Sequence, residues 1–439
     1  MTRLIRILLL ILPASLQAQV PLLTLEDALG TAMQNNYDLL LSKNDSLSYA
    51  LDRSYAYAAF LPRLNATSTK LWNINAQKQE LANGSKRDTS GLRSNNLNGS
   101  IALNWTVFDG LKMFSTRKRL MELEQLGGIN VKAQMVNTVA SVTTAYYNIV
   151  RQKQQLKAIE EQISISEERV KLADRKLNVG LGAKPELLQA RLDLNAQKAN
   201  KLEQATLMEQ LKKQLNQLMA VVLSSDYDVI DSIPLNTQLQ YSAISGSMVL
   251  SNPTLLQARK NIDIARLTVK EREAELYPIL NFNSAFNFNR LQNLAVINNF
   301  TPLFNQNRGF NYGVGFTIPL LNGFNTRRLI QQAKLDVDYQ LLNYKNQLSR
   351  ADLALDNAFR NYEMQKKALL LEQENIDLAR ENVTIALERF RQGVSTFIEL
   401  RVAQISLAEA YNRLIAARYN TKLAEIELLK LRGEVVKGL

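Results

Sequence analysis

The chain has 439 residues and a formal net charge of +12, and it contains no cysteine and no histidine. This composition excludes disulfides, thiolate catalysis, cysteine-based metal sites and the usual general base of enzymes that work near neutral pH. Lysine and arginine are spread along helical patterns and interleaved with glutamate, without a basic block. The positive charge therefore indicates solvated helix faces rather than nucleic-acid binding.

The N-terminus has the layout of a secretory signal peptide. Arg3 and Arg6 precede an apolar run at residues 7–12, and small residues follow up to Ala18. The run is shorter than the roughly 20 residues that a membrane-spanning helix needs. We predict that residues 1–18 form a signal peptide, and that the mature chain is exported and has no transmembrane helix.

The chain contains a long internal duplication. Residues 145–220 reappear without a gap at residues 358–433, a shift of 213 positions. Further upstream the shift becomes 216, as between Asn36 and Asn252. A solenoid repeat has a period of about 20–50 residues, so this pattern instead indicates one structural unit used twice. The predicted domains are a first repeat at 19–222, a linker at 223–250 and a second repeat at 251–439.

Two predicted helices, at 24–58 and 252–276, each lead into a pair of segments that alternate with period two, which predicts β-strands. The four predicted strands are 63–76, 97–108, 279–290 and 310–320. Residues 97–108, for example, place apolar or small side chains on one face, Leu97, Gly99, Ile101, Leu103, Trp105 and Val107, and Phe108 with the polar residues on the other. The apolar faces of the other three strands include Leu64 and Ala66, Phe282 and Phe286, and Phe310 and Tyr312.

Each strand has about 11 residues, the length that crosses an outer membrane. The opposite face is rich in Asn, Ser, Thr and Gly, which suits a water-filled lumen. A soluble sandwich alternates in the same way, but four strands in two distant pairs do not favour it. The polar segments 77–96 and 291–309 are long enough to be external loops.

The rest of the chain is predicted to be helical. Residues 111–179 contain no proline, and an apolar residue recurs every seven positions from Ile149 to Leu177, which indicates coiled-coil packing. A helix of about 70 residues is about 105 Å long, more than a compact globule needs. Shorter helices return at about 186–222 and 397–432, the second opening with a capping box at Thr396 and Glu399.

Four strands cannot close a membrane barrel, because single-chain barrels start at about eight. An open sheet edge in lipid leaves backbone groups unpaired, at several kcal/mol each. The fold class predicted is therefore an α+β membrane protein, internally duplicated, whose four transmembrane strands contribute to a barrel shared between several chains. Three copies would give about 12 strands above a ring of long helices.

Several motifs then carry a resemblance to a known family. The two helix-hairpin tips are Asn178-Val179-Gly180-Leu181 leading to Glu186, and Arg389-Phe390-Arg391-Gln392-Gly393 leading to Glu399. The opening helix contains Leu25-Glu26-Asp27-Ala28-Leu29, and the strand-to-helix junctions contain Asp109-Gly110 and Asn322-Gly323. Together with the duplication, these motifs resemble the TolC family of outer-membrane efflux proteins over essentially the whole mature chain.

The resemblance implies a homotrimer in the outer membrane of a Gram-negative bacterium, with a 12-stranded β-barrel and a long coiled-coil α-barrel in the periplasm. It implies a passive exit duct for small molecules or proteins, without a cofactor or metal, that works with a periplasmic adaptor and an inner-membrane pump. The tips would close the tunnel and dock the adaptor. The residues that match the docking tips are Val179, Gly180, Leu181, Gly393, Val394 and Ser395.

The resemblance also implies an aperture at the tips. Glu399 matches an acid that rings the aperture in the family, and Glu186 is its counterpart in the first tip. Phe390 replaces the family's tyrosine, Ser395 its basic residue and Val402 its second acid, so the usual closing bonds cannot form. The aperture residues we predict are therefore Glu399, Glu186, Phe390, Arg401 and Lys184, the last two as substitutes in closing the channel.

Simpler interpretations stay open for individual residues. Glu399 also fits the role of a helix cap, and Phe390 fits the seven-residue seam of the helix. The alternative function for the whole chain is a surface or periplasmic coiled-coil scaffold without a conducting pore. An enzyme has no support, because the sequence has no His and no Cys, and no pattern in it ties a converging pair of acids to a pocket.

Overall fold

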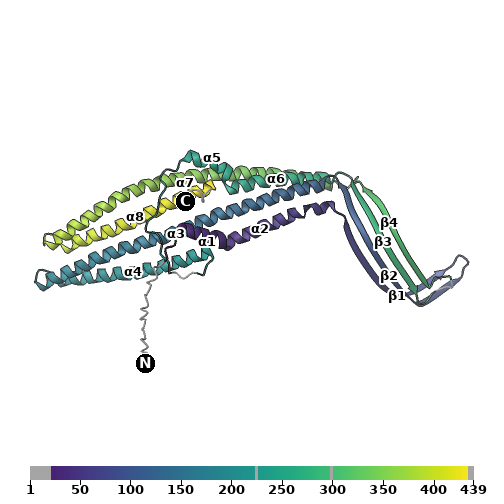
Figure 1. Cartoon of the computed structure of the whole chain (residues 1–439), viewed down its shortest axis with the longest axis horizontal. Helices are drawn as coiled ribbons and strands as arrows, with labels where there is room; N and C mark the ends of the chain where they lie inside the picture. Colours follow the sequence, from purple (N-terminus) through teal and green to yellow (C-terminus); the bar gives the residue numbers. More distant parts are fainter. Residues whose placement is uncertain (1–20, 223–225, 297–299, 434–439) are drawn as a thin grey trace, which may run out of the picture. The chain divides into compact units, whose positions relative to one another are not determined.

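The computed structural model describes residues 21–222, 226–296 and 300–433 (Figure 1). The predicted signal peptide, residues 1–18, lies outside the described residues. Within the described ranges, no helix is both long and apolar enough to cross a membrane. The chain divides into two compact units. The hairpin unit comprises Met1–Ser42, Val131–Pro253 and Leu348–Leu439, and the sheet unit comprises Lys43–Asn130 and Thr254–Gln347.

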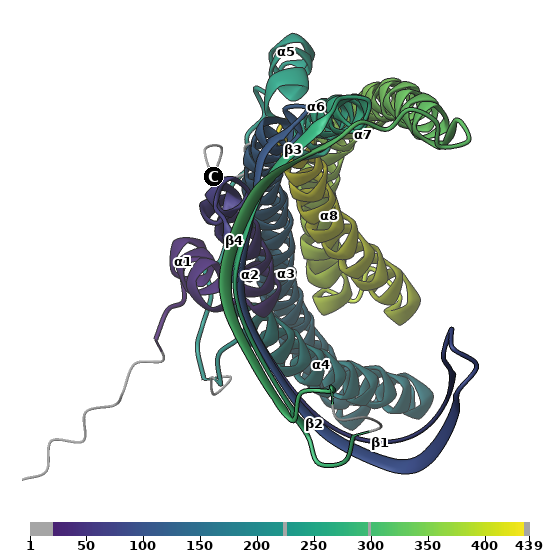
Figure 2. The ribbon, with the colours of Figure 1, turned by 90° about the vertical axis from the view of Figure 1, so that its right-hand side faces the viewer.

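The sheet unit contains four antiparallel strands in the order β1-β2-β3-β4. They are β1 (Arg63–Glu80), β2 (Lys86–Asp109), β3 (Ile279–Asn293) and β4 (Phe304–Thr317). Figure 2 shows the four strands lying side by side on one curved surface. Strands β2 and β3 belong to different repeats, so their pairing joins the two repeats in a single sheet.

The sheet unit also contains helical segments. They are most of α2 (Tyr37–Ser54), the 3₁₀ turn η1 (Ala56–Phe60), α6 (Pro253–Ala274) and the first parts of α3 and α7. The predicted helix at 24–58 is thus split. A Cβ at Gly127, in the middle of α3, would come within 2.9 Å of the Tyr49 ring. The glycine therefore permits a close approach of α2 to α3, and the helix continues through it.

The strand register confirms the predicted faces. Ala66, Ile101 and Phe286 pair in one row, which Phe310 of β4 completes. The row two residues along joins Leu64, Leu103, Ser284 and Tyr312 in the same way. Side chains of one parity share a face of a sheet, so the apolar residues of all four strands lie on the same side. Many remain exposed, including Phe310 at 68%.

Four details of the predicted strands and loops are wrong. The predicted loop at 291–309 is too long, because β3 extends to Asn293 and β4 begins at Phe304. Residues 77–96 are not a loop, because β1 and β2 continue as a ladder in which Lys78 pairs with Asp88, their charged atoms 2.8 Å apart. Polar composition suggested a loop, whereas cross-strand charge pairs support a strand. A register shift between Thr106 and Phe108 pairs Phe108 with Leu280, so Phe108 joins the apolar face. Residues 318–320 lie beyond β4.

The hairpin unit contains α1 (Leu25–Asn35), α5 (Tyr241–Ser251) and two long helical hairpins, except for the first parts of α3 and α7 that belong to the sheet unit. The first hairpin pairs α3 (Lys112–Asn178) with α4 (Lys184–Met219), and the second pairs α7 (Asn325–Arg391) with α8 (Phe397–Arg432). Helices α3 and α7 each have 67 residues, and α4 and α8 each have 36. Each pair begins 213 positions apart, so the predicted duplication of long and short helices is confirmed.

One hydrogen bond marks the duplication in atomic detail. The side-chain amide of Asn36 donates to the carbonyl of Leu218 over 2.8 Å. In the second repeat the amide of Asn252 donates to the carbonyl of Leu431 over 2.9 Å. Both asparagines interrupt a helix, and both satisfy a carbonyl near the end of a returning helix, which otherwise lacks an intrahelical partner.

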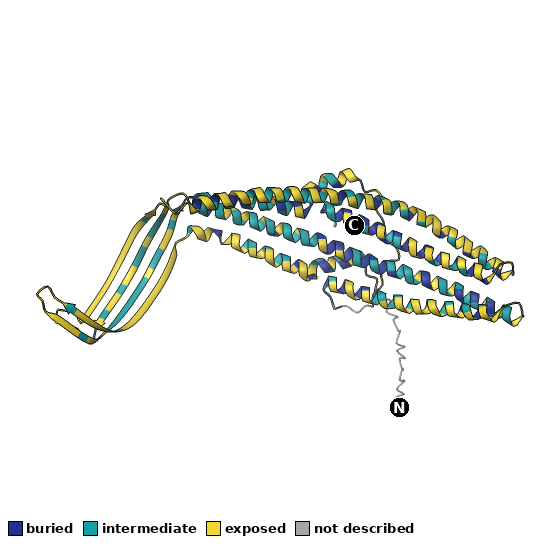
Figure 3. Cartoon of the chain, turned by 180° about the vertical axis from the view of Figure 1, so that it is seen from behind, coloured by how far each residue is buried: buried dark blue, intermediate teal, exposed yellow. Residues whose placement is uncertain are grey.

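The core of the hairpin unit lies between the helices and part of the predicted linker. Figure 3 shows that the buried residues lie in the helices, whereas the strands are exposed or intermediate. Tyr146 and Leu215 are fully buried there, together with Tyr227 from the segment after α4. Lys422 and Glu425 form a buried ion pair at 2.8 Å, and the Glu425 carboxylate accepts the backbone N–H of Asn236. These contacts fix the linker segment against α8.

Candidate functional site at the hairpin tips

The first tip turns on Gly180. Its backbone has φ = +77°, a left-handed conformation that glycine adopts without a steric penalty. The N–H of Gly180 donates to the carbonyl of Leu177 over 3.1 Å, and the N–H of Leu181 donates to that of Lys176 over 2.9 Å. This pair of bonds is a Schellman motif, which ends α3 and satisfies its last carbonyls.

The second tip repeats this motif at Gly393, which also has φ = +77°. The N–H of Val394 donates to the carbonyl of Arg389 over 2.9 Å. Thr396 is the N-cap residue of α8, and its hydroxyl oxygen accepts the N–H of Glu399 over 3.2 Å. The bond from the Glu399 N–H to Thr396, which is one half of the predicted capping box, is therefore confirmed, and it stabilises the start of α8 by about 1 kcal/mol.

Both tips present apolar side chains to solvent. Val179 is 68% exposed, Leu181 81% and Val394 66%. A Cβ at Gly182 would lie 2.9 Å from the backbone nitrogen of Leu177, so only glycine lets the chain fold back so closely here. Small, rigid turns with exposed aliphatic residues are suited to contact another protein, and the docking role of these residues stays a prediction.

Phe390 does not face solvent, since it is 2% exposed. It packs with Ala190 of the first hairpin and with Phe397 and Leu400 of the second. Lys176 of α3 donates to the Phe390 carbonyl over 2.7 Å, and its ammonium lies 3.7 Å from the ring centre. This burial favours the packing interpretation of Phe390 over a direct position at the aperture.

An ionic cluster lies about one to three helical turns inside the tips and joins the two hairpins. Asp193 of α4 binds Arg169 of α3 at 2.8 Å and Arg401 of α8 at 3.0 Å. Gln189 donates to the other carboxylate oxygen over 2.8 Å. The guanidinium of Arg169 also lies 5.2 Å from the centre of the Phe397 ring. The side chains of Arg169 and Asp193 are 2% and 18% exposed, whereas that of Arg401 is 42% exposed.

The cluster holds Asp193 in its charged form. Burial by itself raises the pKa of Asp193, but the hydrogen bonds from Arg401 and Gln189 and the charges of Arg169 and Arg401 outweigh it. The pKa of the carboxyl group is therefore below its ordinary value of 3.8. Burial lowers the pKa of Arg169, and the attraction of Asp193 opposes that shift. The side chain of Arg169 is almost completely removed from water, so its positive charge needs this carboxylate as a compensating partner.

The structure thus brings together some of the predicted residues and separates others. Arg401 bridges the hairpins through Asp193, whereas Lys184 is exposed at the start of α4. The carboxylates of Glu399 and Glu186 form no ion pair within the described part of the chain, where Glu399 is exposed and Glu186 is half-buried.

Sequence analysis missed Arg169 and Asp193. The available signal was a difference between the repeats, because the shift of 213 places Asn382 opposite Arg169 and Ser406 opposite Asp193.

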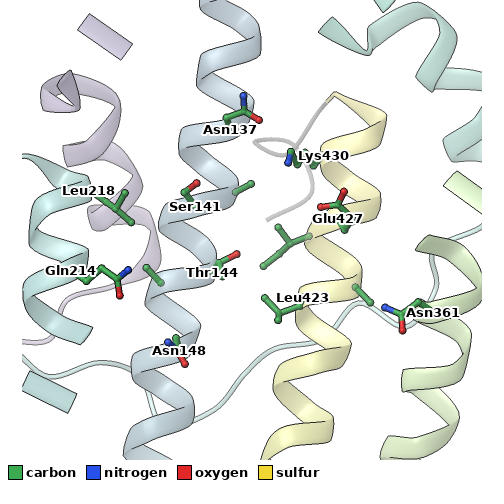
Figure 4. Close-up of a pocket in the computed structure, with 14 residues that line it drawn as sticks. Asn137, Ser141, Thr144, Asn148, Gln214, Leu218, Asn361, Leu423, Glu427 and Lys430 are labelled. Atoms are coloured by element: carbon green, nitrogen blue, oxygen red, sulfur yellow. The ribbon is translucent and has the colours of Figure 1, made fainter. Parts of the chain in front are cut away.

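A second feature of the hairpin unit is a groove between α3 and α8, which encloses about 780 Å³ (Figure 4). A polar stripe of α3 lines it, formed by Asn137, Ser141, Thr144 and Asn148. Glu427 of α8 lies on the opposite wall. In the described ranges, no three acidic side chains converge as metal ligands. The groove therefore offers hydrogen-bonding groups, and its lining residues do not form a recognisable catalytic arrangement.

Residues 28–221 and 245–434 match the family model described as outer membrane efflux protein. The chain belongs to this family. Among the curated relatives of this efflux protein is the outer membrane efflux protein BepC of Brucella suis biovar 1, which is 22% identical over 94% of this chain and 86% of the relative. The outer membrane protein TolC of Escherichia coli K12 is 21% identical over 91% of this chain and 82% of the relative.

Solved structures show the same fold. The outer-membrane channel OprN superposes on this efflux protein with a TM-score of 0.75 and 16% identity, covering 93% of this chain and 89% of OprN. The CmeC outer membrane channel of Campylobacter jejuni gives a TM-score of 0.76 and 17% identity, covering 93% and 85%. The predicted family, duplicated α+β fold, outer-membrane location and efflux function are confirmed, in preference to a scaffold without a pore.

Proposed function

We propose that this efflux protein is a homotrimer that forms the passive exit duct of a tripartite export system. Strands β1 and β4 are each paired on one side only within the described sheet, and the apolar face of the sheet is exposed. An open edge in lipid leaves backbone groups unpaired, so sister chains must complete the pairing. Three sheets of four strands would close a barrel of about 12 strands, within the known range.

The same proposal assigns the helical hairpins to the periplasm. Proteins of this family work with an adaptor and an inner-membrane pump, and we propose that the tips of α3–α4 and α7–α8 face both. The exposed residues Val179, Leu181 and Val394, with the glycines of the two turns, would dock the adaptor. The unpaired carboxylates of Glu399 and Glu186, with Lys184, would line the aperture.

We assign the control of the aperture to the contact between the hairpins. Arg169 and Asp193 of the first hairpin are joined to Arg401 of the second by ion pairs. Lys176 of the first hairpin also donates a hydrogen bond to the carbonyl of Phe390 in the second. Opening a tip by moving one hairpin requires these contacts to break. The domain boundaries that accompany this proposal are those predicted from the sequence: the repeats at 19–222 and 251–439, joined by residues 223–250.

Planar-bilayer recording tests the proposal. The purified protein should form conducting channels, and Glu399→Ala should weaken block by divalent cations added from the tip side, because a ring of three carboxylates would be lost. Glu409→Ala is the matched control, since this exposed glutamate lies ten residues further along α8, about 15 Å from Glu399. The absence of conductance would refute the duct. Unchanged block in Glu399→Ala would remove this residue from the aperture.

A further inference from the structure

The apolar face of the sheet carries a basic cluster without ionic partners among the described residues, level with the end of the β3–β4 ladder that is farther from the helices. In the register, Lys70 of β1, Leu97 of β2 and Arg290 of β3 form one row, next to Gln306 of β4. Arg308 lies two residues along β4 from Gln306, so it is diagonal to Arg290 on the same face. All three basic side chains are exposed.

Nothing acidic balances this cluster in the sheet. Lys70, Arg290 and Arg308 have no ion pair with any described residue, whereas Lys78 and Lys86 in the β1–β2 extension are paired with Asp88 and Glu80. The sequence contains no Asp or Glu in residues 63–76, 89–108, 279–293 and 304–317, and the acidic residues of the four strands are Glu80 and Asp88 in the β1–β2 extension and Asp109 at the end of β2. The apolar face therefore has a net positive charge at the level of Lys70, Arg290 and Arg308.

The height of the cluster matches the edge of a lipid bilayer. Ten residues separate Leu280, at the helix end of the apolar face, from Arg290, which corresponds to about 34 Å along the strand. With the strand tilt of about 40° in membrane barrels, the height is about 26 Å, close to the apolar band of about 25 Å.

Aromatic side chains accompany the basic residues at this level. Lys70 lies 4.8 Å from the ring centre of Trp72, and Arg290 lies 5.3 Å from that of Phe304. Aromatic rings are enriched at membrane interfaces, so these pairs indicate the head-group level.

We propose that Lys70, Arg290 and Arg308 bind the phosphate groups of an anionic lipid in the outer leaflet of the outer membrane. The inference rests on the proposed function in one respect, because it places the helix end of the sheet toward the periplasm. Guanidinium groups form paired hydrogen bonds with phosphate, and a row of cations spaced across neighbouring strands fits a head group that carries more than one phosphate. A lipid bound there would hold the barrel at a fixed depth.

The test uses the full-length protein in detergent and measures its affinity for lipid A with two phosphates by native mass spectrometry. In the double variant Arg290→Gln/Arg308→Gln, affinity should fall about 30-fold, since each basic side chain near an anionic surface contributes about 1 kcal/mol. Arg63→Gln is the matched control. Arg63 is also an exposed sheet arginine, but it pairs in the row of Asn104 and Asn283 on the polar face. Its substitution should leave the affinity unchanged.

A second variant separates charge from folding. Arg290→Lys/Arg308→Lys keeps both charges and should retain most of the affinity, and lipid A without phosphate should bind weakly to every form. The proposal is overturned by wild-type affinity in the glutamine variant, by an equal loss in Arg63→Gln, or by equal binding of the phosphate-free lipid. Loss of binding in the lysine variant would also overturn it. Failure of the exit duct would appear separately, as missing conductance with lipid binding intact.

Discussion

Removal of the Asp193 carboxylate tests how the two hairpins are held together. In Asp193→Asn, the guanidinium of Arg169 loses its only ionic partner among the described residues while it stays 2% exposed. Loss of one member of a buried pair costs about 3–5 kcal/mol, and the lower end applies because Asp193 itself is 18% exposed. Arg401 is 42% exposed, so Arg401→Gln should cost at most about 1 kcal/mol.

Amide hydrogen exchange at the starts of α4 and α8, followed by mass spectrometry, can distinguish these two costs. A loss of about 3 kcal/mol accelerates exchange through local opening by about 100-fold in Asp193→Asn, against about five-fold or less in Arg401→Gln. Arg413→Gln is the control, because Arg413 pairs at 3.1 Å with Glu372 inside the second hairpin. Equal acceleration in the variants of Asp193 and Arg401, or none in Asp193→Asn, would refute the argument from burial.

Three further predictions concern stability and pH. Asn36→Ala and Asn252→Ala should each lower the thermal unfolding midpoint, since each loses at least the hydrogen bond to a carbonyl of a returning helix, worth about 1–2 kcal/mol. Asn36→Ala also loses the bond that its amide oxygen accepts from the N–H of Leu39 over 3.1 Å. An unchanged midpoint in either variant would show that the asparagine does not stabilise its junction. Glu425→Gln leaves Lys422, 4% exposed, without its partner and should cost about 3–5 kcal/mol, while Lys422→Met/Glu425→Leu should be closer to the wild type.

For pH, the depressed pKa of Asp193 means that its stabilising effect is present above pH 3.8 and is lost as pH falls further. Exchange at the tips, corrected for intrinsic rates, should therefore stay constant from pH 8 to 5 and rise in stronger acid.

The fold could be predicted to a large extent from the sequence, because it depends on periodicities that local packing enforces. The period of two placed Ala66, Ile101, Phe286 and Phe310 on one face, and the register joins them in one row. The seven-residue seam and the shift of 213 likewise gave two pairs of long and short helices. These patterns can be found in the sequence because side chains one or two turns apart in a helix, and every second side chain in a strand, lie on the same face.

The tertiary structure alone decided which side chains meet across elements. The ladder of 77–96 and the bulge at Phe108 depend on the partner strand, which composition does not reveal. Asp193 lies 24 residues from Arg169 and 208 from Arg401 along the chain, and only the lateral packing of two hairpins brings them together. Phe390 is buried for the same reason, because Ala190 of the first hairpin packs against it together with Phe397 and Leu400. The sequence by itself thus determined the periodic elements and their duplication, whereas the contacts that join the hairpins follow from how those elements pack.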